Sequence, residues 1–240
     1  MTEAIQTIPV SSLMIAIVPV LGVIFLIQKW NGEGGESLYA MSRMLIQLLI
    51  IGYFLTFLFD SDGVLLVSAV IVVMITVSSW IALRTVKMRR KDLYKQTLVA
   101  IFVGASIPLI VITQLVLDLE PFYSARQVIP LAGMIVANAM NSVSIAAERV
   151  NSEIDAQRSF VDARSLAFKA ALIPITNSLF AVGLVSLPGM MTGQILSGVD
   201  PLIATRYQIM VMCMLFSSAG ISSALFLVLI QNKFEVDSTA

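Results

Sequence analysis

The sequence predicts an all-α integral membrane protein, in which residues 1–240 form one domain of about seven transmembrane helices. Of its 240 residues, only 12% are charged and 58% are hydrophobic. A soluble domain has roughly 25% charged residues, and one core of this size could not bury so much apolar surface. The charges are also clustered, so that seven long uncharged runs lie between them. Since about 20 apolar residues in a helix cross a bilayer, these runs are the predicted spans.

The first two spans are less regular than those that follow. The uncharged runs are, in order, residues 4–28, 44–59, 63–83, 96–117, 127–147, 170–199 and 207–232. Pro9 and Pro19 predict a kink in the first helix, because proline cannot donate the helical hydrogen bond. This run also lacks the basic start of a signal peptide, which indicates an uncleaved membrane helix. The second run is short, but Arg43 can extend its guanidinium to the headgroups and so allow the run to span.

The sixth run is too long for one straight helix, since it has 30 residues. Pro188 and Gly189 predict a break at that point, after which residues 188–200 re-enter between helices or lie at the interface. Residues 169–187 would then cross the bilayer. Irregular backbone inside a membrane persists only where protein shields it or where it faces water. The segment 188–200 is therefore the most unusual part of the chain.

The distribution of basic residues predicts the orientation, because Lys and Arg in short loops stay on the cytoplasmic side. With seven spans and an external N-terminus, 13 of the 15 basic residues fall on the cytoplasmic side. Arg126 and Arg206 are the two that fall outside. The predicted topology therefore has its C-terminus in the cytoplasm.

Several function classes lack the residues that they need. The chain has no His and a single Cys, which excludes common zinc sites, Ser-His-Asp and Cys-His catalytic groups and an intrachain disulfide. A net charge of zero does not favour a nucleic-acid partner. No run carries a charge at its centre, as ion-coupled carriers usually do, and the last run has no Lys for a retinal Schiff base. Without a GxxxxGK[ST] loop the chain is not expected to be an enzyme that hydrolyses ATP.

Residues 148–169 form the longest predicted cytoplasmic connection. They include four acidic and four basic residues and contain neither Gly nor Pro. Val150, Ile154 and Phe168 give the segment an apolar stripe, which predicts an amphipathic helix. Such a helix can dock into a groove of a partner protein. It can equally lie on the membrane surface as a simple connector.

Polar and sulfur-containing side chains within the spans are the candidates for a transport pathway. Polar groups at membrane depth line water or bond across helices, and the second role is the commoner one. Thioether sulfur suits soft ions such as Cu(I) better than Fe(III), although Met also fills gaps between helices. The polar candidates are Asn138, Asn141, Ser142, Ser144, Thr176, Asn177 and Ser178, and the sulfur-containing ones are Met190, Met191, Met210, Met212, Cys213 and Met214.

Two stretches resemble a known family. PLAGMIVANAMNSVSIAAERVNSEI (130–154) and ALIPITNSLFAVGLVSLPGMMTGQILSGVDPLIATRYQIMVMCMLF (171–216) resemble the FetB-type permeases, which are implicated in bacterial iron export and include the plant aluminium-tolerance permease. A weaker likeness extends over SRMLIQLLIIGYFLTFLF (42–59), and LPGMMTGQI (187–195) is the most specific part. The resemblance implies a permease subunit of an ATP-binding-cassette transporter in the cell membrane. Two copies would then pair with two soluble ATPase subunits, which use the ATP, and this chain would bind no cofactor.

The resemblance also implies roles for individual residues. Residues 148–169 would be the coupling loop, although it is shortened here, and its docking charges would be Glu148, Arg149, Glu153, Asp155, Arg158, Asp162 and Arg164. The substrate candidates come from the polar side chains in the spans and from the segment 187–195, and they are Asn138, Asn141, Asn177, Met190, Met191, Thr192 and Gln194. The resemblance favours Met190 and Met191 over the other methionines as the candidate metal ligands. The expected function is export of iron or another metal ion. The alternative is a channel or scaffold subunit that needs no ATPase.

Overall fold

Helices make up nearly all of the backbone in the computed structural model, which describes residues 8–59 and 63–235. The chain divides into two compact units, residues 1–61 and 62–240. The predicted all-α class is confirmed. Within the described residues, the extended backbone pairing is a single isolated bridge between Val182 and Ser186.

The first predicted span is interrupted as its prolines suggest. It is divided into α1 (Val10–Ile15) and α2 (Ile17–Asn31), which are separated at Ala16. Pro19 has no N–H to donate to the carbonyl of Ile15, so the helical hydrogen-bond ladder fails next to that position. The structure therefore shows an interruption of the helix next to Pro19, and the kink itself stays a prediction.

The second span is longer than its uncharged run. α3 (Gly34–Phe59) has 26 residues and includes Arg43, so the helix needs no help from that side chain to reach across a bilayer. A tight turn joins α2 to α3: Gly32 has a φ of 72°, and the side chain of Gln28 accepts a hydrogen bond from Gly34 N at 3.0 Å. Most large apolar side chains of α2 and α3 are exposed, which suits helices that face lipid.

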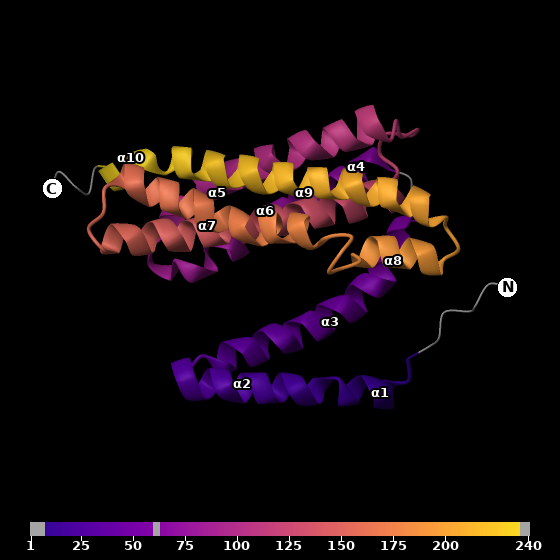
Figure 1. The fold of residues 1–240 in the computed structure, drawn as a ribbon, viewed down its shortest axis with the longest axis horizontal. Coiled ribbons are helices and arrows are strands. Elements are labelled where there is room, and N and C mark those ends of the chain that lie inside the picture. Colours follow the sequence, from indigo (N-terminus) through magenta and orange to yellow (C-terminus); the bar gives the residue numbers. More distant parts are fainter. Residues whose placement is uncertain (1–7, 60–62, 236–240) are drawn as a thin grey trace. The chain divides into compact units, whose positions relative to one another are not determined.

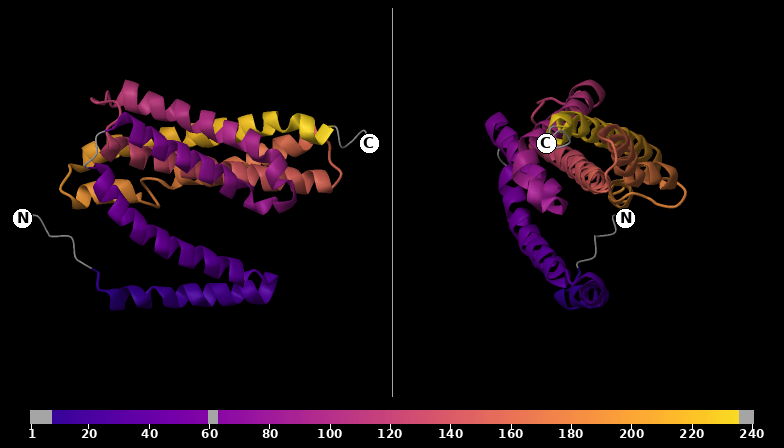
Figure 2. Two further views of the ribbon diagram at one scale, coloured as in Figure 1. Left: turned by 180° about the vertical axis from the view of Figure 1, so that it is seen from behind. Right: turned by 90° about the vertical axis from the view of Figure 1, so that its left-hand side faces the viewer.

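The second unit is a bundle of five long helices that run along one another (Figures 1 and 2). α6 lies at its centre and packs against each of the other four. The long helices are α4 (Val64–Ala82), α5 (Arg90–Ile110), α6 (Ala125–Asp155), α7 (Phe160–Ala181) and α9 (Pro201–Leu229). The short elements are the 3-10 turns η1 (Leu83–Thr85) and η2 (Lys87–Arg89), the π-helical turn η3 (Val111–Val116), α8 (Gly189–Leu196) and α10 (Gln231–Glu235).

Six helical segments in the described part of the chain are long and apolar enough to cross a membrane. α7, which corresponds to the predicted sixth span, is not among them, and its first turns carry Asp162, Arg164 and Lys169. It nevertheless lies along the bundle and packs against α6 and α9. The seven predicted spans therefore correspond to these six segments and α7. Which end of the bundle faces the cytoplasm stays a prediction.

The break in the sixth run lies earlier than predicted. α7 ends at Ala181 rather than at Pro188, and residues 182–188 form a turn. Its backbone is satisfied locally, since the Ala181 carbonyl accepts hydrogen bonds from Val185 N at 2.8 Å and Ser186 N at 3.1 Å. Pro188 instead stands directly before α8, where its missing N–H costs nothing. The proline therefore marks the beginning of a helix, and the expectation that it ends one was wrong.

Gly104 makes possible a close approach between α5 and α9. A Cβ atom at this position would lie 2.7 Å from Ser222 N and 2.9 Å from Ser222 Cα, and it would also collide with Ser222 Oγ. Ser222 is fully buried on α9. Small residues allow membrane helices to approach in this way, and the gain is packing energy along the contact. Gly104 therefore fixes the spacing of α5 and α9.

Replacing Gly104 with Ala should push α5 and α9 apart. The added methyl group meets the backbone of Ser222, which cannot move aside as a flexible side chain would, and such overpacking costs about 1–3 kcal/mol. The measurement is the unfolding free energy in mixed micelles. Gly220→Ala is the matched control, because a Cβ atom there meets nothing within 4 Å. Equal stability of the two variants would contradict the close contact.

Candidate functional site

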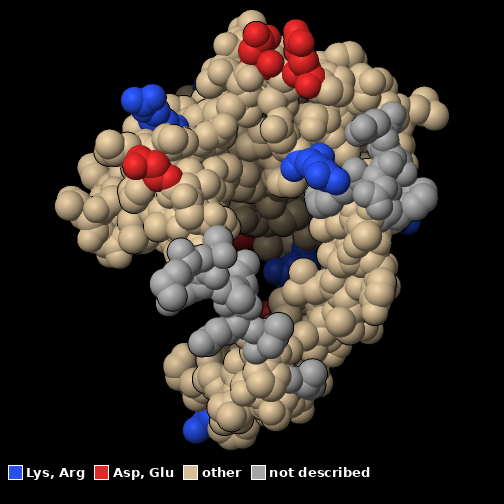
Figure 3. Space-filling model, turned by 90° about the vertical axis from the view of Figure 1, so that its right-hand side faces the viewer, with Lys and Arg blue, Asp and Glu red and all other residues tan. Residues whose placement is uncertain are grey.

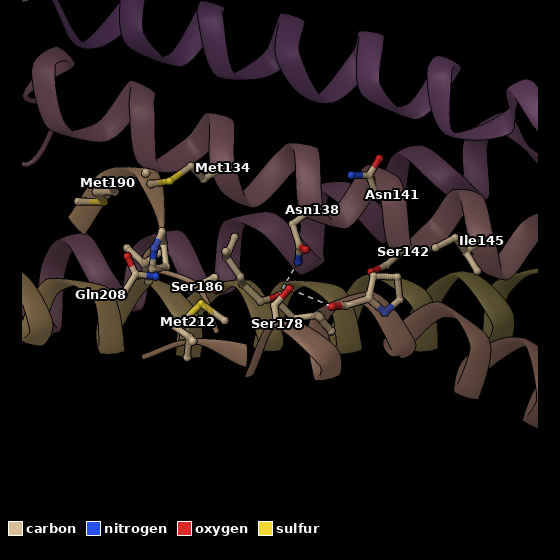
Figure 4. A pocket seen from close by; sticks show the side chains of 17 residues that line it. Met134, Asn138, Asn141, Ser142, Ile145, Ser178, Ser186, Met190, Gln208 and Met212 are labelled. Atoms are coloured by element: carbon tan, nitrogen blue, oxygen red, sulfur yellow. Dashed lines mark hydrogen bonds between the residues drawn. The ribbon is translucent and has the colours of Figure 1, made fainter. Parts of the chain in front are cut away.

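A cavity of about 420 Å³ lies among α6, α7, α8 and α9 (Figure 4). We call it the inner cavity. The turn after α7 contributes Val182, Ser186 and Pro188 to its wall, so the break in the helix helps to create the space. Its polar lining consists of amides and hydroxyls, from Asn138, Asn141, Ser142, Ser178, Ser186 and Gln208. None of the described lining residues carries a formal charge.

Asn138 both lines the inner cavity and joins two helices. Its side-chain Nδ2 donates to the Leu215 carbonyl at 2.6 Å and to Ser218 Oγ at 3.1 Å, both on α9. The two roles considered for this residue, pathway lining and contact between helices, therefore coincide. Asn141 also lines the cavity, but its amide points in the opposite direction from that of Asn138 (Figure 4).

Gln208 is a site residue that the sequence did not reveal. Its side chain is 5% exposed, and its Oε1 has no hydrogen-bond partner within the described residues. An unpaired buried amide oxygen is costly unless water or a ligand bonds to it. Gln208 lies beside Met212 and Ser186 in the wall of the inner cavity (Figure 4). Gln208 lies within the stretch 171–216 and is polar in an apolar run, but it was not among the candidates, and only the packing of α9 against α7 and α8 shows its position.

A second cavity, of about 800 Å³, lies nearer one end of the bundle. We call it the end cavity. Its wall includes Leu117 and Leu119, which follow η3, and Val199, which precedes α9. Arg126 is the charged residue among its described lining. Figure 3 faces this end of the molecule, where isolated charges lie on a largely uncharged surface.

The structure brings only some of the predicted substrate residues together. Asn138, Asn141 and Met190 line the inner cavity, whereas Gln194 lines the end cavity. The remaining candidates, Asn177, Met191 and Thr192, line neither cavity.

Local contacts explain why some candidates lie apart from the cavities. Asn177 is exposed on α7. Thr192 Oγ1 donates to the Pro188 carbonyl at 3.1 Å and so stabilises the first turn of α8. Sequence proximity within the motif 187–195 therefore does not by itself place a side chain in the cavity.

Methionines form much of the apolar lining. Met134, Met190 and Met212 line the inner cavity, and Met134, Met190 and Met210 line the end cavity. Met134 was not a candidate from the sequence, because it comes from α6 and meets α8 only in the folded chain. No group of three or more His, Cys, Asp or Glu converges on a metal-sized site within residues 8–59 and 63–235.

The segment 148–169 is not the single amphipathic helix expected. It consists of the last turns of α6, a turn at residues 156–159 and the first turns of α7. Gln157 adopts a left-handed backbone with a φ of 63°, and its N–H bonds to the Ile154 carbonyl at 2.9 Å. Ser159 then caps α7, accepting a hydrogen bond from Asp162 N at 3.2 Å. These turn and cap contacts, which periodicity does not reveal, interrupt the helix.

Glu153 stabilises this turn from within the protein. Its side chain is 7% exposed and forms ion pairs with Arg149 and with Arg158, whose Nε lies 2.8 Å from Glu153 Oε2. Asp155 in turn accepts a hydrogen bond from Asn151 at 2.9 Å. Most of the predicted docking charges therefore build the turn itself. Glu148 and Arg164 take no part in these turn contacts.

Aromatic packing closes the bundle at the same end. The rings of Phe160 and Phe234 stack with centroids 6.0 Å apart, and the guanidinium of Arg89 lies 4.4 Å from the centroid of Phe234. The connections at residues 83–90 and 156–159 therefore meet the C-terminal helix α10. All three were predicted to be cytoplasmic, and their common position agrees with that prediction.

Replacing Asn138 with Ala should weaken the bundle, because it removes the two hydrogen bonds to α9. Bonds of this kind between membrane helices contribute about 0.6 kcal/mol on average and at most about 1.7 kcal/mol. The measurement is again the unfolding free energy in mixed micelles. Asn177→Ala is the control, since Asn177 is exposed on α7. A loss as large in the control would show that the cross-helix bonds are not the cause.

Replacing Glu153 with Gln should loosen the turn at residues 156–159, since the two arginines lose their carboxylate partner. Both arginines are about half exposed, so the free energy needed to open the turn should fall by about 1 kcal/mol. The fraction of molecules in which the turn is open then rises roughly fivefold. The rate of tryptic cleavage after Arg158 measures this population. Glu148→Gln serves as the control. Unchanged cleavage in the Glu153 variant would rule out the stabilising role.

Comparisons with known proteins match most of the chain. A family model described as "Uncharacterised protein family (UPF0014)" matches residues 10–166 and 160–234. The "UPF0014 membrane protein slr1647" of Synechocystis is 35% identical over 222 residues, which cover 85% of each chain. The "Probable iron export permease protein FetB" of Escherichia coli is 36% identical, over 83% of this chain and 81% of its own.

A plant protein shows the same likeness. "Protein ALUMINUM SENSITIVE 3" of Arabidopsis thaliana is 32% identical over 86% of this chain and 80% of its own length. No solved structure matches the chain significantly. The resemblance noted in the sequence is therefore confirmed by relatives that span nearly the whole chain. With its apolar helices and these matches, the chain belongs to the UPF0014 family of multi-pass membrane proteins.

Proposed function

We propose that the chain is the membrane-spanning permease subunit of an ATP-binding-cassette transporter, which exports iron or another metal ion. The single observation that carries the proposal is the division of the bundle into a closed, charged end and a half that contains cavities. The name of the Escherichia coli relative, a probable iron export permease, supports the same function. Two copies of the chain would assemble with two soluble ATPase subunits.

The helices that connect the charged end of the bundle to the inner cavity support this role. α6 and α7 both begin or end at the turn 156–159, and both line the inner cavity, through Asn138 and Ser178. Asn138 lies 17 residues before Asp155, which corresponds to about 25 Å along α6. Glu153 pairs with Arg149 on α6 and with Arg158 in the turn, and Ser159 caps the start of α7, so the turn is held to the ends of both helices. An ATPase that docks there can therefore act on the cavity.

The alternative is a channel or scaffold that needs no ATPase. The packed aromatic end does not favour a permanently open channel, because Phe160 and Phe234 are both nearly buried. A scaffold role would not account for the inner cavity. The decisive question is whether an ATPase binds at the turn.

Charge reversal tests the docking surface directly. The double variant Glu148→Lys with Arg164→Glu should lose copurification with a coexpressed candidate ATPase of the ATP-binding-cassette class, while membrane insertion is retained. Charged residues at a protein interface contribute to affinity when they face charges of opposite sign on the partner. Reversing two of them should therefore weaken binding of the ATPase by about tenfold or more. These two residues are chosen because they take no part in the ion pairs that hold the turn.

Arg206→Glu is the matched control, since Arg206 is exposed near the start of α9, far along the chain from the turn. It should leave the complex intact. If the double variant copurified as well as this control, the turn would not be the docking site. If no ATPase copurified with the unaltered chain, the ATPase-independent alternative would replace the proposal.

A further inference from the structure

The inner cavity and the end cavity share two methionines in their walls. Met134 of α6 and Met190 of α8 are the described residues that line both spaces. Figure 4 draws these two side chains on the same side of the inner cavity, above Gln208 and Met212. Their thioether groups therefore border both cavities.

The chemistry of the walls restricts what can pass. The inner cavity offers amides, hydroxyls and thioethers but no carboxylate, and the charge lining the end cavity is the cation of Arg126. A divalent or trivalent hard ion that loses its water needs anionic oxygen ligands, and without them the cost of dehydration is large. A soft monovalent ion has less charge to stabilise and binds neutral thioether sulfur well.

Met134 and Met190 are accessible from the cavities, unlike Met214. Met214 on α9 is 1% exposed and belongs to the hydrophobic core, as expected of a side chain that only fills a gap. Met134 and Met190 pack against the same core, but they are partly exposed and line the cavities. Met212, which is 8% exposed, adds a sulfur to the wall of the inner cavity, and Met210 adds one to the end cavity. Both cavities therefore offer thioethers.

We propose that Met134 and Met190 bind a soft monovalent cation of the Cu(I) class at the wall that the two cavities share. The inference rests on the proposed function for its transport role and narrows the metal to this class. Binding itself needs no ATPase. Gln208 Oε1, which lacks a partner in the described chain, lies in the same wall and can accept a hydrogen bond from water around the ion.

The test uses Ag(I), which has the same charge and softness as Cu(I) and does not change oxidation state. The full-length protein in lipid nanodiscs is dialysed against Ag(I), and bound metal is counted. All variants carry Cys213→Ser, because the exposed thiol of Cys213 would bind Ag(I) by itself. We expect one Ag(I) per chain, with sulfur neighbours in X-ray absorption spectra. Fe(II), dialysed anaerobically, should not be retained.

Met134→Leu and Met190→Leu should each weaken Ag(I) binding by about tenfold or more, since even groups beyond the direct ligands change metal affinity by this factor. Leu conserves the volume of Met, so the fold should tolerate both changes. Met191→Leu and Met140→Leu are the matched controls, on the same two helices but outside both cavities. Thermal unfolding of every variant checks the fold.

Failure of Ag(I) to bind the Cys213→Ser protein would overturn the inference, and so would unchanged binding in the Met134→Leu, Met190→Leu double variant. Copurification with the ATPase is measured in the same preparations. A chain that recovers its ATPase but binds no Ag(I) keeps the proposed function and loses the soft-metal site. A chain that binds Ag(I) at these methionines without any ATPase keeps the site and loses the proposed coupling.

Discussion

Backbone hydrogen bonding within an apolar solvent is the constraint on which the rest of this structure depends. A bilayer offers no water to an unpaired N–H or carbonyl, so the chain must satisfy each group internally. Long helices do this along most of the sequence. Where α7 stops, the Ala181 carbonyl accepts more than one N–H, and Gly183 N bonds to the Ser186 carbonyl at 3.0 Å. The turn therefore satisfies these backbone groups by itself, and this allows a non-helical segment to form part of the wall of the inner cavity.

The uncharged lining of that cavity has the same origin. Charged side chains lie mainly at the ends of the bundle, where water or headgroups solvate them, and amides and hydroxyls are the strongest polar groups that remain inside. Asn138 shows how such a group can remain polar without being left unpaired, because α9 supplies both of its acceptors. Gln208 shows the opposite case, since its Oε1 has no hydrogen-bond partner among the described residues and is available to water or a ligand. The cavity is therefore polar but electrically neutral.

Features that depend on local sequence could be predicted, and features that depend on packing could not. The uncharged runs identify the helices, and Pro19 locates the first interruption of a helix, because both act over a few neighbouring residues. Pro188 was assigned to the end of a helix, although proline is equally at home before one, and sequence alone does not separate these cases. The turn at Gln157 was hidden for a similar reason, since a left-handed residue without glycine leaves no compositional mark.

The site was only partly visible for the same physical reason. Asn138 and Met190 belong to a recognisable motif or stand out as polar residues in an apolar run, so they could be proposed. Met134 and Gln208 lie in the two stretches that resemble the family, but nothing in the sequence distinguishes them there as cavity residues. They line the cavity because α6 and α9 pack around α7, which ends in the turn at residues 182–188. This packing brings together positions more than 70 residues apart, as the hydrogen bond from Asn138 to Leu215 also does.

The contact between Gly104 and Ser222 also limits how this bundle can change shape. Two helices that touch backbone to side chain at one point interlock, because sliding either one along its axis would drive the next side chain into the same small gap. Sliding of α5 along α9 is therefore resisted at this contact, and a change in the shape of the bundle has to keep the two helices together there.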